Sequence, residues 1–96
     1  MIDEVFLALR QMREVRSASA FSRDFLGMES NYYRSLKRRT SGPSPIAVLR
    51  CAAKLRQRGE VFLDSTIPIA VKHRADLLAM AERCIEDLLT TVDAQL

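Results

Sequence analysis

The residue types that most often perform catalysis are few in this chain and lie far apart. His73 is the single histidine, and its neighbours Lys72 and Arg74 offer no group that would orient it as a general base. We therefore expect His73 to lie on an exposed helix surface. Cys51 and Cys84 form no Cys-x-x-Cys pair, and one histidine does not complete a zinc site of standard spacing. The sequence thus predicts no enzyme activity, no metal ion and no cofactor.

Basic residues, in contrast, are concentrated in one part of the chain. Residues 1–60 hold twelve Lys/Arg and six Asp/Glu, whereas residues 61–96 hold three and six. No acidic residue occurs between Glu29 and Glu60. A basic segment followed by an acidic tail is typical of a polyanion-binding surface with a separate assembly element, although a solvated basic surface without a partner is the alternative. The bases in that stretch are Arg34, Lys37, Arg38, Arg39, Arg50, Lys54, Arg56 and Arg58.

The length and composition of the chain indicate one small globular domain. It has 96 residues, of which 48% are apolar and 28% charged. No apolar run approaches the roughly 20 residues of a membrane span. Asp3 and Glu4 stand where a secretory signal carries bases, and both cysteines lie among apolar neighbours, which suits reduced thiols in a protein core. We expect a cytoplasmic protein that does not enter a membrane.

The spacing of apolar residues predicts an all-α chain of five helices. Gly27 should end the second helix in a left-handed conformation, and Gly59 should end the fourth. Ser44 followed by Pro45 is typical of a helix start. Residues 61–63 are expected to form an extended link. The expected helices cover residues 2–16, 18–25 and 30–39, then 45–58, and finally a long helix that begins near Pro68 and runs to the end.

Residues 17–55 carry a pattern that combines several of these features. Phe21 lies in a short helix, Gly27 marks a turn, and Tyr33 and Leu36 occupy the inner positions of the next helix. This pattern resembles the lambda-repressor-like, or Xre/Cro-type, helix-turn-helix domain. It is also similar to small uncharacterised alphaproteobacterial proteins with a Phe-Ser-Arg…Leu-Gly…Tyr-Tyr…Leu pattern. One feature departs from the family: the spacing from Phe21 to Gly27 is one residue longer, which predicts a wider turn.

The resemblance implies a fold and a function. Residues 1–60 would form a four-helix helix-turn-helix core, and residues 61–96, by their apolar and acidic pattern, a linker and a dimerisation helix, within one structural domain. The implied function is that of a sequence-specific transcriptional regulator of bacterial or phage type, such as a repressor, which binds double-stranded DNA as a homodimer with its third helix in the major groove. The alternative is a protein-interaction module on the same scaffold, such as an antirepressor, an antitoxin or an adaptor. RNA binding is less well supported because no aromatic stacking platform is evident.

The same resemblance assigns residues of the third helix and its flanks to DNA. Asn31 would pair with adenine and Arg34 with guanine, which are favourable bidentate contacts in the major groove. Tyr32 and Tyr33 have the alternative of simply packing in the core. The candidate base-reading residues are Ser30, Asn31, Tyr32, Arg34 and Ser35, and the candidate phosphate-binding residues are Ser17, Ser19, Lys37, Arg38, Arg39 and Thr40.

The final helix carries an apolar stripe that suits contact with a second chain. At about 1.5 Å per residue it would be roughly 40 Å long, which exceeds what the rest of a small core can cover. Folding of this helix back over its own core is the alternative, and the two are compatible. The candidate dimer-interface residues are Val71, Leu78, Ala81, Ile85, Leu88 and Val92.

Overall fold

The structure is a computed structural model that describes residues 2–38 and 42–95, with side chains up to residue 91. The prediction of an all-α chain is confirmed, since the described residues form helices and contain no strand. The helices are α1 (Ile2–Gln11), α2 (Ala18–Ala20), the π-helical turn η1 (Phe21–Phe25), α3 (Tyr32–Leu36), α4 (Pro45–Glu60) and α5 (Pro68–Gln95).

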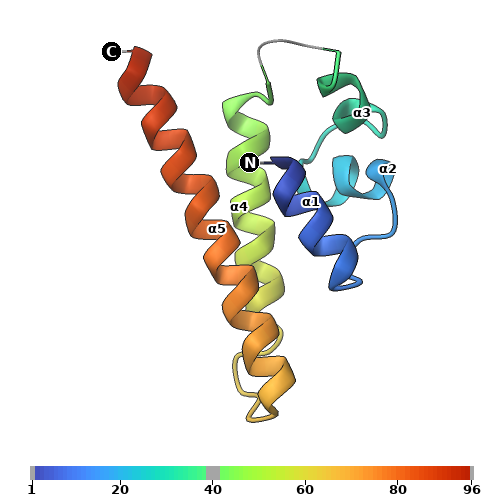
Figure 1. Cartoon of the computed structure of the whole chain (residues 1–96), viewed down its shortest axis with the longest axis vertical. Helices are drawn as coiled ribbons and strands as arrows, with labels where there is room; N and C mark the ends of the chain where they lie inside the picture. Colours follow the sequence, from blue (N-terminus) through green and yellow to red (C-terminus); the bar gives the residue numbers. More distant parts are fainter. Residues whose placement is uncertain (1, 39–41, 96) are drawn as a thin grey trace.

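An antiparallel hairpin of α4 and α5 forms the long axis of the molecule (Figure 1). The shorter helices α1, α2 and α3 gather on the side of α4 away from α5 in this view. The molecule measures 42 × 30 × 17 Å, so it is flat and elongated. α1 nevertheless reaches α5, because Arg83 Nη2 donates to Glu4 Oε2 at 2.8 Å.

Aromatic side chains from α1, η1 and α3 form the centre of the core. Phe21 is fully buried, and its ring centroid lies 5.2 Å from that of Phe6, 6.0 Å from that of Phe25 and 5.2 Å from that of Tyr33. Offset and edge-to-face rings at such distances attract each other in addition to burying apolar area. These rings hold the three short helices together.

The first helix ends earlier than its apolar spacing predicts. The spacing indicated residues 2–16, but α1 ends at Gln11. Arg13 adopts a left-handed conformation with φ of 61°, and Glu14 N donates to the carbonyl of Leu9 at 2.9 Å. This reversal returns the chain toward the core, where Val15 is buried. Nothing in the residue type of Arg13 announces such a turn, because left-handed backbone favours glycine.

The second helix accommodates the additional residue between Phe21 and Gly27 as a π-helical turn. Helix over residues 18–25 is as predicted, but Leu26 N donates to the carbonyl of Phe21, five residues back, at 3.1 Å. A π-helical turn takes one residue more than an α-helical turn, so the helix absorbs the insertion without a break. Gly27 follows with φ of 64°, which confirms its predicted role as a left-handed helix end.

A buried serine joins the second helix to the third. Ser22 Oγ donates to the carbonyl of Ala18 at 2.9 Å and accepts from the backbone N–H of Tyr33 at 3.0 Å. That N–H belongs to the first turn of α3, where Asn31 provides no side-chain cap. Ser22 therefore satisfies a helix-terminal donor that would otherwise be buried without a partner. This contact fixes α3 against η1.

The fourth helix begins as predicted but does not end where predicted. Ser44 Oγ accepts from the N–H of Ala47 at 3.3 Å, which confirms the predicted N-cap. The prediction that Gly59 ends the helix is wrong, since α4 continues to Glu60 and Gly59 is buried. A Cβ atom at position 59 would lie 3.1 Å from Cδ2 of Leu78. The Leu78 side chain would have to shift to accept a larger residue at position 59, because α5 approaches closely here.

The fifth helix covers the region expected for a long terminal helix and packs along α4. The predicted extended link at residues 61–63 is instead a series of turns, with Phe62 packed partly against the core. Leu77, Ala81 and Cys84 of α5 are fully buried, so α5 shares a core with residues 1–60. None of the described helices is long and apolar enough to cross a membrane.

Candidate nucleic-acid interface

The short helix α3 presents a polar side to solvent and an aromatic side to the core. Ser30, Asn31 and Arg34 are exposed, whereas Tyr33 is buried. Ser35 is half-buried, and its hydroxyl donates to the carbonyl of Tyr32 at 2.8 Å. The structure brings four exposed or half-exposed residues of this helix and its end around one shallow surface groove. They are Asn31, Arg34, Ser35 and Arg38.

Tyr32 does not occupy the exposed position on α3 that base reading would require. Its side chain is only 8% exposed. Its hydroxyl accepts from the backbone N–H of Ser44 at 2.9 Å, at the start of α4. Tyr32 thus packs in the core, which was the alternative, and ties α3 to α4. In this conformation its ring cannot reach a base edge.

Tyr33, the next residue of α3, anchors the helix to α1. Its hydroxyl donates to the carboxylate of Asp3 on α1, and the Nζ atom of Lys37 lies 5.8 Å from its ring centroid. Burial and the nearby Asp3 carboxylate raise the pKa of Tyr33, so its hydroxyl stays protonated. α3 is therefore held by its two tyrosines, and its polar side is left to solvent.

The predicted phosphate-binding residues occupy two neighbouring elements. Lys37 and Arg38 are exposed at the C-terminal end of α3, whereas Arg39 and Thr40 lie outside the described residues. Ser17 is the N-cap of α2, where its Oγ accepts from the N–H of Ala20 at 3.1 Å. Ser19 is half-exposed one residue into the same helix, and α2 lies against α3.

Among the described bases between Glu29 and Glu60, Arg50 and Arg58 have hydrogen-bond partners within the fold instead. Arg50 donates to the carbonyl of Gly27 at 2.8 Å and so holds the turn between η1 and α3. Arg58 pairs with Glu14. Within the described residues no ion pair involves Arg34 or Lys37, so their charges face solvent. The positive charge of α3 is therefore available to a polyanion.

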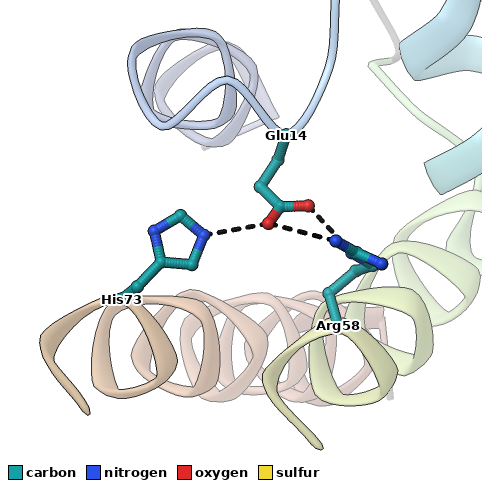
Figure 2. Close-up of polar contacts among 3 residues, drawn as sticks. All are labelled: Glu14, Arg58 and His73. Atoms are coloured by element: carbon teal, nitrogen blue, oxygen red, sulfur yellow. Dashed lines mark hydrogen bonds and ion pairs between the residues drawn. The ribbon is translucent and has the colours of Figure 1, made fainter. Parts of the chain in front are cut away.

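The prediction that His73 lies on an exposed helix surface without an orienting partner is wrong. His73 Nε2 lies 2.9 Å from Oε1 of Glu14, whose other oxygen accepts from Arg58 Nε at 2.8 Å (Figure 2). The Phe62 ring lies edge-on to His73 with centroids 5.1 Å apart. The Glu14 side chain is only 6% exposed. These residues join the turn after α1 to α4 and α5, a contact that local spacing cannot reveal.

The electrostatics of this cluster favour an ionised Glu14. Burial opposes ionisation, but the hydrogen bonds and positive charge of Arg58 and His73 outweigh it and lower the pKa of Glu14. The arrangement joins the turn after α1 to α4 and α5.

Replacing Glu14 with glutamine is expected to lower the free energy of unfolding by about 1–3 kcal/mol at neutral pH, because Arg58 and His73 lose a charged acceptor. The folded-state pKa of Glu14 is lowered, so its contribution is complete at neutral pH and is lost as the pH falls below the ordinary value of 4.5. Urea unfolding at several pH values measures the difference. Glu60→Gln, at an exposed site, is the control. If the difference in unfolding free energy between the parent protein and the variant does not become smaller in acid, the assignment of an ionised Glu14 is contradicted.

The two cysteines meet between α4 and α5. Both are free and fully buried. The neighbouring Cys84 thiol, together with burial, raises the pKa of Cys51 and keeps its thiol neutral. They are thus reduced core thiols, as their apolar neighbours predicted. The described residues contain no group of three His, Cys, Asp or Glu side chains that could hold a metal ion.

The candidate dimer-interface residues divide between the core and the surface. Ala81 is fully buried in the chain's own core, and Ile85 and Leu88 pack partly against it. Leu78 is half-buried against Gly59. Val71 is exposed, and the side chain of Val92 lies outside the described residues. Part of the predicted stripe thus covers its own chain.

Comparison with known families covers almost the whole chain. The family of unknown function DUF6626 matches residues 2–95. The chain belongs to this family. Its match extends from α1 to α5. No curated protein and no solved structure matches the DUF6626 chain.

Proposed function

We propose that this protein is a sequence-specific transcriptional regulator that binds double-stranded DNA as a homodimer and places α3 in the major groove. The observation that carries the proposal is the two-sided character of α3. Tyr32 and Tyr33 fix its inner side, and its outer side presents Asn31, Arg34 and Arg38 around one groove. Such a helix offers base-reading groups on a rigid support.

The length of α3 limits which residues would contact bases. With five residues the helix is about 7.5 Å long, so only its first turn and the residues before it would enter the groove. Ser30, Asn31 and Arg34 occupy that position. Lys37 and Arg38 follow at the end of the helix, where phosphate contacts would set the orientation without specifying sequence. We leave Tyr32 out of this set because it is buried.

Single substitutions on α3 should separate sequence reading from phosphate binding. The preferred site is first selected from a random duplex library with the parent protein. Asn31→Ala and Arg34→Ala are expected to relax preference at particular base pairs, each by about 1–3 kcal/mol. Lys37→Ala should weaken binding to all sequences alike and reduce the slope of log affinity against log salt concentration by about one. Arg10→Ala, at an exposed site on α1, is the control. Unchanged preference in both α3 variants would contradict the proposal.

A protein-interaction function is the second candidate, and it has an observation of its own. The end of the hairpin between α4 and α5 exposes several large apolar residues, which suits a protein partner better than DNA. Binding through this end would be insensitive to salt and would survive the α3 substitutions. The residues concerned are Val61, Leu63, Ile67 and Ile69.

A further inference from the structure

The packing of α4 against α5 fixes which of their residues lie side by side. Gly59 lies against Leu78, and the thiol of Cys51 lies beside that of Cys84. The helices are antiparallel, so each step toward the start of α4 is matched by a step toward the end of α5 (Figure 1). Continued along both helices, this register brings Ile46 level with Leu89.

Exposed apolar residues follow one side of each helix of this hairpin. Ile46 and Leu49 are both 51% exposed, and their spacing of three places them on one side of α4. On α5, Val71 is 47% and Leu89 58% exposed. Helical spacing places Val71, Leu78 and Leu89 on the same side of this helix. Exposed apolar positions of two helices that pack against each other thus define an apolar surface on the hairpin.

This surface lies on the side of the hairpin that α1 leaves open. α1 meets α5 through Arg83, which binds Glu4, and through Met80, which lies beside Val5. By helical spacing, Met80 points almost opposite to Leu78 and Leu89 on α5, and Arg83 points well away from both. The apolar surface is therefore free of the chain's own short helices.

Charges near the middle of the surface favour a second copy of this chain as its occupant. Arg56 continues the exposed side of α4, and Glu82 and Glu86 flank the apolar side of α5. When two copies pair about a two-fold axis that runs along the hairpin, α4 of one lies over α5 of the other. Each Arg56 then faces an acidic partner helix, and Ile46 and Leu49 of one copy lie over Leu89 of the other. The surface is thus complementary to itself in charge, and its apolar residues meet apolar residues of the partner.

We propose that two copies of the protein pair through this hairpin face, defined by Ile46, Leu49, Val71, Leu78, Ile85 and Leu89. The inference deepens the proposed function, from which it takes the homodimer, and it assigns the contact to both helices of the hairpin. Ala81 and Leu88, predicted for the interface, serve the core instead. In such a dimer α3 of each copy remains on the outside.

Sedimentation equilibrium of the full chain without DNA tests this interface. The parent protein is expected to have twice the monomer mass of 10.9 kDa at micromolar concentration. Leu49→Glu combined with Leu89→Glu should give a monomer, because buried unpaired charges oppose association. Leu7→Glu, at a 59% exposed position on α1, should remain a dimer. A monomeric parent protein, or a dimer that survives the double substitution, would overturn the inference.

Charge reversal provides a second test that does not depend on apolar area. Arg56→Glu and Glu82→Arg are each expected to weaken the dimer at least about tenfold, and their combination should restore it. Circular dichroism confirms that each variant folds. If the double variant does not recover the dimer affinity of the parent protein, Arg56 and Glu82 do not face each other across the interface. A folded monomer of the parent protein that still binds DNA would refute this interface and the homodimer but not DNA binding by α3, whereas a dimer that binds no DNA would refute only the DNA-binding part of the proposed function.

Discussion

Phe21→Ala is expected to cost about 3–5 kcal/mol of unfolding free energy, the largest effect of any single core substitution considered. A domain of this size is stable by only about 5–15 kcal/mol. The substitution removes the ring that contacts Phe6, Phe25 and Tyr33, and so loosens α1, η1 and α3 together. α3 would lose its support, so we expect DNA binding to fall as well.

Urea unfolding followed by circular dichroism measures this cost. Phe62→Ala is the matched control, because it removes the same side chain from a half-buried site outside the aromatic cluster. We expect it to cost less than half as much. Equal costs for the two variants would show that the aromatic cluster is not the centre of the core.

The combined substitution Arg34→Ala, Lys37→Ala and Arg38→Ala is expected to lower DNA affinity about a hundredfold or more. Arg34 supplies a base contact worth roughly 1–3 kcal/mol, and the other two bases supply phosphate contacts. All three side chains are exposed. Stability should therefore change little, and the loss reports on binding.

A triple variant with the same change of charge distinguishes position from net charge. Arg10→Ala, Arg16→Ala and Lys72→Ala remove three exposed bases from α1, its following turn and α5. We expect this variant to keep affinity within a few fold of the parent protein at moderate salt. Equal losses in the two triple variants would mean that overall charge, and not α3, attracts DNA.

Local signals in the sequence predict much of the helical arrangement. Ser44 and Pro45 start α4 because a hydroxyl cap and a fixed φ act within one turn. Gly27 ends the second helix because its left-handed conformation is a property of that residue. The longer spacing after Phe21 even points to the place where the helix widens into η1. These features depend on neighbours in the chain, which a sequence displays directly.

Features that depend on distant partners could not be predicted in this way. Glu14 and His73 are 59 positions apart, so only the folded hairpin brings them together. Gly59 looks like a helix end, but the approach of α5 makes it a packing position. Tyr32 lies next to the polar residues of α3. Only the folded structure shows that its hydroxyl accepts a hydrogen bond from the backbone N–H of Ser44. For the same reason, the sequence does not show which apolar residues of α5 pack in the core and which lie on the surface.

DNA binding by α3 is tested most directly by the salt dependence of binding to a labelled duplex of mixed sequence. Fluorescence anisotropy titrations at about 50 and 200 mM salt are compared. With about six phosphate contacts per complex, affinity is predicted to fall on the order of a thousandfold between them. No binding at the lower salt, or binding that salt leaves unchanged, would contradict DNA recognition and favour a protein partner.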